Sequence, residues 1–228
     1  DSIYFNQRND CYMMTVADGV GGGSRGDIAS GIVTEVCGEI FRYLSEDPEA
    51  GKLRGSIRKI AEISTTRIKN ETEKSPKHSS MASTLTIAAG VSQSYVIGNI
   101  GDSRTYLISG ESARQITEDH TYIREIENQY NEQIVESLRE EMGHVITRSV
   151  SRHQSPIDLF PESEEHFSLK EGDALLLCSD GMIPEKAGGL ETVLWSKIRN
   201  SKSMDEALDQ LIEWALENGS SDNISLVL

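Results

Sequence analysis

The chain has 228 residues, of which 37% are hydrophobic and 26% are charged, enough for one large domain or two small ones. No apolar run reaches the roughly 18–20 residues of a membrane-spanning helix, so we expect no membrane contact for this segment. The formal net charge of −15 at pH 7 argues against nucleic acid or an anionic membrane as the main partner.

The N-terminal residues are typical of two strands, Ile3–Phe5 and Tyr12–Ala17. No basic region or apolar core of a signal peptide precedes them. The chain begins inside a strand-like run without an initiator Met, and it ends inside another at Ile224–Leu228. We therefore expect residues 1–228 to be a single domain that has been trimmed at both ends.

Helical periodicity follows these strands. Apolar residues recur between Ile28 and Leu44 at the spacing of one helix face, and again between Leu53 and Ile68. A third helix is predicted around Ala207–Leu216, where Ser203 and Glu206 have the spacing of a capping box.

Further strand-like runs occupy the middle and the end of the chain, at Leu85–Ala89, Tyr95–Ile100, Thr105–Ile108, 166–169 and Ala174–Cys178. The helices come in pairs rather than after every strand. This order predicts an α+β fold with mostly antiparallel sheets, arranged as a sandwich with the helices outside.

Residues Tyr122–Met142, called the insert below, interrupt this succession of strands. They are highly polar, with five apolar residues in rough helical spacing. Such a segment is typical of a mobile flap beside a site, and equally of an ordinary pair of surface helices.

Three widely spaced cysteines, Cys11, Cys37 and Cys178, favour buried thiols in a reducing compartment such as the cytoplasm. Cys178 lies in an apolar strand-like run and is interpreted as a core residue rather than a nucleophile. The five histidines lack metal-ligand spacing, so solvent-facing or structural roles are favoured for them.

Four aspartates lie beside strand-like runs and are followed by small or polar residues. They are Asp18, Asp102, Asp180 and Asp222. An Asp-Gly pair taken alone is more typical of a β-turn, but four such places along one chain are an improbable coincidence. Carboxylates that converge need a cation, and oxygen-only ligands select hard ions such as Mg²⁺ or Mn²⁺. The pattern therefore indicates a metal-dependent hydrolase.

Taken together, these stretches resemble the metal-dependent protein phosphatases of the PPM type, the type 2C Ser/Thr phosphatases, in a bacterial form. The resemblance spans almost the whole chain in the family's order. It rests on Asp1, Ala17–Gly22, Met81–Thr84, Gly98–Arg104, Thr117–Thr121, Val145–Ser149, Leu175–Gly181 and Ser221–Ile224. It implies an αββα sandwich with a flap between Thr121 and Val145, and a centre of two Mn²⁺ or Mg²⁺ ions at one edge.

The resemblance also implies roles for single residues. Asp18 would bridge both metals and position the water that attacks phosphorus, joined by the Gly19 carbonyl. Asp1 would complete one metal's shell, while Asp180 and Asp222 would bind the other. Asp102 would bind a weaker third ion together with Asp180. Arg104 and Asn223 would not bind a metal themselves but would contact and position the ligand residues.

The implied reaction is hydrolysis of phosphoserine and phosphothreonine in proteins by a metal-bridging hydroxide, without a phospho-enzyme. The implied partners are phosphoproteins and a cognate Ser/Thr kinase, and we expect a monomer. The alternative is a non-catalytic module on the same fold that binds a phosphoprotein or a kinase. A phosphatase of a sigma-factor partner-switching pathway is a third reading, which the sequence does not separate from the first.

Three features depart from the family's pattern. Val20 stands where some members place a His that protonates the leaving group. The family's Arg that grips phosphate comes a few residues before the first Asp, at a position that lies before Asp1 and is therefore not seen here. Ala82 replaces a Gly, a small-for-small change. The run Gly21–Gly26 lacks the Gly-Lys-Ser/Thr of a nucleotide-binding loop, so it is interpreted as the turn into the first helix.

Overall fold

The computed structural model describes residues 1–20, 25–44, 50–75, 78–127, 129–162, 166–184 and 188–228. Within these residues no helix is long and apolar enough to cross a membrane.

The larger of the two main sheets has six strands, and every pairing in it is antiparallel. Five strands follow in spatial order, and the sixth, β9, pairs with β6 beside β10. They are β1 (Ser2–Arg8), β2 (Cys11–Ala17), β5 (Leu85–Val91), β6 (Ser94–Ile100), β10 (Phe167–Ser168) and β9 (Asp158–Phe160).

The second sheet has four antiparallel strands, and a short two-stranded ladder lies apart from both. In spatial order the four are β12 (Leu226–Val227), β11 (Ala174–Cys178), β7 (Arg104–Ser109) and β8 (Ser112–Gln115). The short ladder joins β3 (Gly19–Val20) to β4 (Ala82–Ser83).

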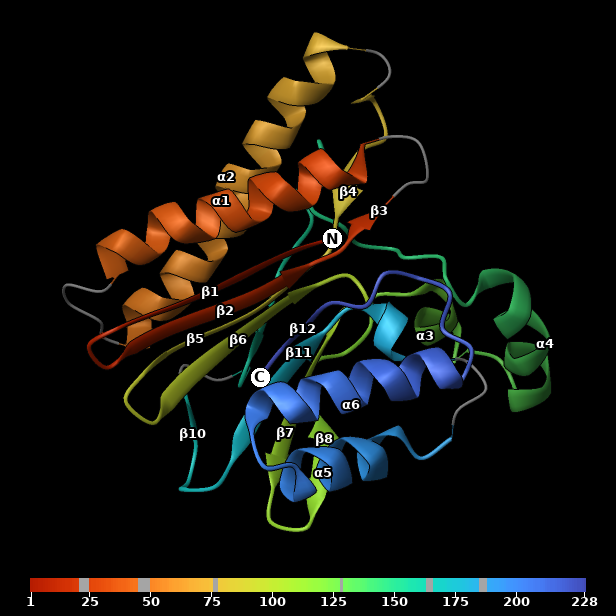
Figure 1. The fold of residues 1–228 in the computed structure, drawn as a ribbon. Coiled ribbons are helices and arrows are strands. Elements are labelled where there is room, and N and C mark those ends of the chain that lie inside the picture. Colours follow the sequence, from red (N-terminus) through yellow and green to blue (C-terminus); the bar gives the residue numbers. More distant parts are fainter. Residues whose placement is uncertain (21–24, 45–49, 76–77, 128, 163–165, 185–187) are drawn as a thin grey trace.

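Helix pairs cover the outer faces of the sandwich (Figure 1). The pair α1 (Gly26–Leu44) and α2 (Ala50–Lys74) lies on the first sheet, and α5 (Leu190–Asn200) and α6 (Met204–Glu217) lie on the second. This arrangement confirms the αββα sandwich.

Strand β2 shows why the sandwich forms. Its side chains alternate between two hydrophobic clusters, because successive residues of a strand point to opposite faces. Met13 packs in the cluster under α1 and α2, whereas Met14 packs in the cluster between the two sheets. Both faces of β2 are therefore covered, and its run of buried residues is nearly continuous.

The predicted helices and strands are confirmed, but the short strands β3, β4, β8 and β9 were not predicted. Helix α5 was not predicted, because Leu190, Leu194 and a few partly buried residues give only a weak apolar stripe. The last strand is shorter than Ile224–Leu228, since only Leu226 and Val227 pair with β11.

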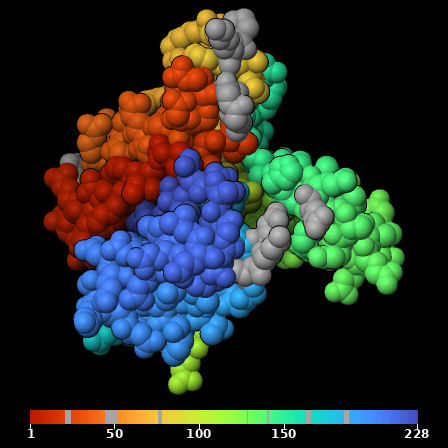
Figure 2. All heavy atoms as spheres, turned by 45° about the vertical axis from the view of Figure 1, so that its right-hand side comes forward, coloured from red at the N-terminus to blue at the C-terminus, as the bar shows by residue number. Residues whose placement is uncertain are grey.

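The insert forms two short helices, α3 (Tyr122–Ile126) and α4 (Glu132–Met142). Ile123, Ile126 and Val135 make a small hydrophobic cluster of their own, separate from the two cores of the sandwich. Figure 2 shows these green residues standing out from the body of the molecule. The insert is a pair of helices, which both interpretations of it allow, and its mobility stays a prediction.

Candidate metal centre

The structure brings the predicted aspartates to one edge of the sandwich. Asp18 directly follows β2, Asp102 comes two residues after β6, and Asp180 opens the 3-10 helix η2 (Asp180–Met182) after β11. Asp222 lies in the connection between α6 and β12. A cavity of about 630 Å³, called the aspartate cavity below, is lined by all four, together with Asp1, Gly19 and Asn223.

The pKa values of Asp18 and Asp102 are both raised, as expected for carboxylates that are buried close to other carboxylates. Burial, followed by the neighbouring Asp180, raises the pKa of Asp18 to about 8. Burial and Asp180 also raise the pKa of Asp102 to about 7.

A divalent cation fits this donor set. The Oδ1 atom of Asp180 is buried and has no hydrogen-bond partner, although buried polar atoms are nearly always satisfied. In the described residues, no three His, Cys, Asp or Glu side chains are already grouped to hold an ion. A hard divalent ion would supply the partner that Oδ1 of Asp180 lacks and would offset the charge of the neighbouring carboxylates.

Thr84 holds the backbone of Asp18 in place. The amide of Asp18 donates to Oγ1 of Thr84 at 2.9 Å, and the amide of Thr84 donates to the carbonyl of Asp18 at 2.8 Å. The Thr84 hydroxyl also meets that of Ser103 at 2.7 Å. Thr84 belongs to a stretch that the sequence marked, but its contact with Asp18 links residues 66 positions apart and has no local signal.

Two close backbone contacts need glycine. A Cβ atom on Gly19 would lie 2.5 Å from the backbone of Gly26, at the start of α1, and the reverse also holds. A Cβ atom on Gly181 would lie 2.1 Å from the carbonyl oxygen of Asn223. The first contact packs α1 against the residue after Asp18, and the second brings the Asp222 loop against η2.

The residue before Asp102 is held by His120. The amide of Gly101 donates to Nδ1 of His120 at 3.0 Å, and the carbonyl of Gly101 accepts from the amide of His120 at 3.0 Å. Nε2 of His120 lies 2.9 Å from Oδ2 of Asp158, which also accepts from Arg148 through its other oxygen at 3.0 Å. Because Nδ1 accepts, Nε2 carries the proton and donates to Asp158. His120 therefore has a structural role, and sequence reasoning did not identify Asp158.

The expected supporting residues have more specific partners than predicted. Arg104 does not bond to Asp102; its guanidinium grips Asp119 through Nε at 2.9 and 3.0 Å and through Nη2 at 2.5 Å. The backbone amide of Asn223 donates to Oδ1 of Asp222 at 2.7 Å, so it orients that carboxylate directly.

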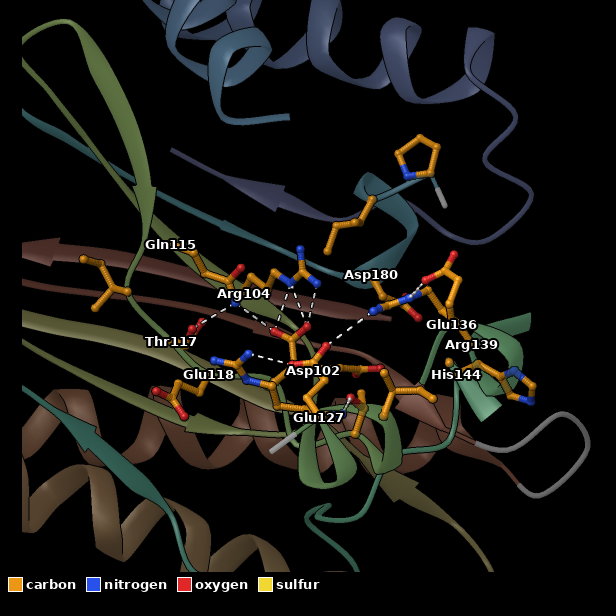
Figure 3. A pocket seen from close by; sticks show the side chains of 18 residues that line it. Asp102, Arg104, Gln115, Thr117, Glu118, Glu127, Glu136, Arg139, His144 and Asp180 are labelled. Carbon is orange, nitrogen blue, oxygen red and sulfur yellow. Dashed lines mark hydrogen bonds and ion pairs between the residues drawn. The ribbon is translucent and has the colours of Figure 1, made fainter. Parts of the chain in front are cut away.

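A second cleft, of about 800 Å³, adjoins the aspartate cavity. Asp102 and Asp180 line both spaces. In Figure 3 these two aspartates lie between residues of β7 and β8 on one side and Glu136 and Arg139 of α4 on the other. The insert is therefore adjacent to the candidate site, as expected of a flap.

Three further expectations concern the cysteines, Val20 and the turn at Gly21–Gly26. All three cysteines are buried and free, and burial raises the pKa of the Cys178 thiol to about 12, which confirms a core role. Val20 lies in β3 and lines the aspartate cavity. The predicted turn at Gly21–Gly26 lies outside the described residues from Gly21 to Ser24, and Gly26 already belongs to α1.

Comparisons with known proteins agree with this geometry. A family model described as protein phosphatase 2C matches residues 1–228. The Serine/threonine phosphatase stp of Listeria welshimeri is 28% identical over 228 residues, covering 98% of this chain and 86% of that protein.

Two solved structures share the fold. The catalytic domain of the serine/threonine protein phosphatase PstP in complex with two manganese ions has a TM-score of 0.78 and 26% identity, over 99% of this chain and 88% of that one. The Mycobacterium tuberculosis serine/threonine phosphatase PstP/Ppp has a TM-score of 0.80 and 23% identity, over 99% of this chain and 95% of that one.

Proposed function

The chain belongs to the protein phosphatase 2C family, and we propose that the aspartate cavity is the binuclear metal centre of its reaction. The protein is a metal-dependent protein serine/threonine phosphatase. The observation that carries the site assignment is the convergence of Asp18, Asp102, Asp180 and Asp222, with Oδ1 of Asp180 buried and without a partner.

In this proposal each ligand has a distinct place. Asp18 would be a ligand of both ions, and the Gly19 carbonyl and Asp1 would complete the ligand set of one of them. Asp180 and Asp222 would hold the second ion. The hydrogen bond from Oγ of Ser225 to Oδ2 of Asp1, at 2.9 Å, supports this role because it holds Asp1 at the cavity.

Bound divalent ions would lower the pKa of a water between them and offset the charge of the phosphoryl group. The protein contributes positioning. Asp18 is fixed at its backbone by Thr84, and Asn223 orients the carboxylate of Asp222. Val20 offers no proton to the leaving alkoxide, and a water could serve as the donor instead.

Further details belong to the same proposal. The ions are Mn²⁺ or Mg²⁺, and Asp102 with Asp180 binds a weaker third ion. The substrates are proteins phosphorylated on Ser or Thr by a cognate kinase, and the enzyme acts as a monomer. The three buried free thiols support a reducing compartment such as the cytoplasm.

A non-catalytic binding module is not favoured. Such a protein has no need of a carboxylate at every ligand position, yet each of Asp1, Asp18, Asp180 and Asp222 is present and lines one cavity.

The test is hydrolysis of p-nitrophenyl phosphate and of a phosphothreonine peptide. We expect activity with Mn²⁺ or Mg²⁺, none with excess EDTA, and a loss of at least about 100-fold in Asp18→Asn, because the ion-bridging oxygen is removed. Asp10→Asn, in the exposed turn between β1 and β2, is the matched control and should retain full activity. Activity that survives EDTA, or that survives in Asp18→Asn, would contradict the proposal.

A further inference from the structure

The aspartate cavity has too much negative charge to attract a phosphate without help. Six aspartates line it: Asp1, Asp18, Asp27, Asp102, Asp180 and Asp222. Among the described lining residues, Arg25 is the one Lys or Arg. With His144 neutral, the six aspartates and Arg25 give the lining side chains a formal charge of −5. Two bound divalent ions would reduce this charge to −1. A phosphomonoester carries nearly two further negative charges at pH 7.

We propose that Arg25 is the residue of this chain that contacts the phosphoryl group of the substrate. The inference rests on the proposed function and deepens it. Arginine suits the task because its planar guanidinium donates two parallel hydrogen bonds to phosphate oxygens.

Backbone packing fixes Arg25 beside the metal ligands. It directly precedes Gly26, whose backbone touches that of the ligand Gly19 so closely that neither position has room for a Cβ atom. The carbonyl of Arg25 accepts from the amides of Ile28 and Ala29 at 3.0 and 3.3 Å, so this residue also begins α1. The start of the side chain is therefore held at a defined place on the rim of the cavity.

The backbone of Arg25 has a φ of 68°, a conformation that non-glycine residues rarely adopt. Residues held in this way are concentrated at functional sites. Glycine would fit the conformation without strain, so an arginine here indicates a use for its side chain.

The guanidinium is available to a substrate. Its partner is Asp27, at 3.2 Å between Nε and Oδ1, and the two side chains are 51% and 69% exposed. Exposed ion pairs of this kind contribute little to stability, so a phosphate can take the place of Asp27. Asp27 then acts as a competitor that holds Arg25 at the rim when no substrate is bound.

The experiment compares steady-state kinetics on p-nitrophenyl phosphate with inhibition by inorganic phosphate, in saturating Mn²⁺. For Arg25→Ala we expect both KM and the Ki of phosphate to rise roughly 10-fold, because a charge-assisted hydrogen bond is lost. The Kd of Mn²⁺, measured by calorimetry, should stay within about twofold of the wild-type value. Arg25 is paired with Asp27, which is not one of the proposed metal ligands.

Three further variants sharpen the test. Arg25→Lys keeps the charge without the paired donors and should recover part of the loss. Asp27→Asn removes the competing charge and should lower both KM and Ki. Arg67→Ala is the matched control: this arginine is paired with Glu39 between α1 and α2, does not line the cavity, and should leave both constants unchanged.

Two outcomes separate the two proposals. If the wild-type protein hydrolyses the substrate but Arg25→Ala keeps the wild-type KM and Ki, the role of Arg25 is overturned while the metal centre stands. If the wild-type protein is inactive with every divalent ion, the proposed site itself fails. Because Ala and Arg have similar backbone costs at positive φ, a thermal melt of Arg25→Ala should match the wild type and exclude misfolding.

Discussion

At the scale of single residues, burial of the Asp18 carboxylate opposes folding of the metal-free protein at neutral pH, because the charged form is the one that burial disfavours. The Asp18 pKa of about 8 lies far above the roughly 3.9 of an unfolded chain. The folded state therefore binds this proton more tightly than the unfolded state does. The stability that this provides is full below about pH 4 and is lost as pH rises toward 8.

We therefore predict that Asp18→Asn makes the metal-free protein more stable near pH 7, on the order of 2 kcal/mol, because the amide has no charge to bury. Urea unfolding followed by circular dichroism in EDTA, from pH 4 to 9, checks this. Wild-type stability should fall across that range more steeply than that of the variant, with Asp10→Asn following the wild type. Parallel profiles for wild type and Asp18→Asn would refute the prediction.

Four aspartates that line the cavity, Asp18, Asp102, Asp180 and Asp222, were found from the sequence because each lies beside an apolar run, whereas Asp1 was implied only by the family resemblance. The sequence did not locate the groups that hold them. Thr84 reaches Asp18 across 66 positions, and Asp158 reaches His120 across 38. Contacts of this length depend on how the sheets pair, which periodicity along the chain does not encode.

At the scale of elements, the contact between β3 and the first turn of α1 decides where the Gly19 carbonyl lies. We predict that Gly19→Ala destabilises the protein by about 1–3 kcal/mol, because its Cβ atom would overlap the Gly26 backbone.

Gly31→Ala is the matched control for this prediction. Gly31 lies in the same helix, and a Cβ atom there meets nothing within 4 Å, so we expect a gain of about 0.5–1 kcal/mol. Chemical denaturation measures both changes, and Mn²⁺ titration should show weaker binding only in Gly19→Ala. A Gly19→Ala variant as stable as the wild type would show that the backbone contact with Gly26 is not needed.

The accuracy of the element predictions also follows from local physics. Helix α1 was predictable because its apolar stripe packs on one sheet, and α6 because Ser203 caps it, accepting from the amide of Glu206 at 3.1 Å. Helix α5 starts after Gly189, which has a φ of 77° and makes no side-chain cap. The start of α5 therefore lacks the Ser, Thr, Asp or Asn capping residue by which a helix start is recognised in a sequence.

At the scale of the whole molecule, the centre joins the two halves of the sandwich. Asp18 and Asp102 come from the first sheet, while Asp180 and Asp222 adjoin the second. Ions that need carboxylates from both halves would bind the folded state alone, so they would stabilise the entire fold by mass action.

We predict that Mn²⁺ at about 100 times its Kd adds about 2.7 kcal/mol, and raises the melting temperature by about 5–10 °C for a protein of this size. Differential scanning calorimetry with and without the ion checks this, at matched ionic strength. Asp180→Asn should show no rise. A rise of the same size in that variant would place the stabilising ion elsewhere.

The hydrogen bond between Ser225 and Asp1 spans 224 positions of the chain, and β12 closes the second sheet next to it. During translation, Asp18 and Asp102 leave the ribosome long before Asp222 does. A nascent polypeptide that has not yet delivered Asp222 and β12 holds an incomplete ligand set, and the loop that joins the first ligand to the last is still open. With the proposed ligand set, dephosphorylation by this protein would begin only after Asp222 and β12 have been synthesised.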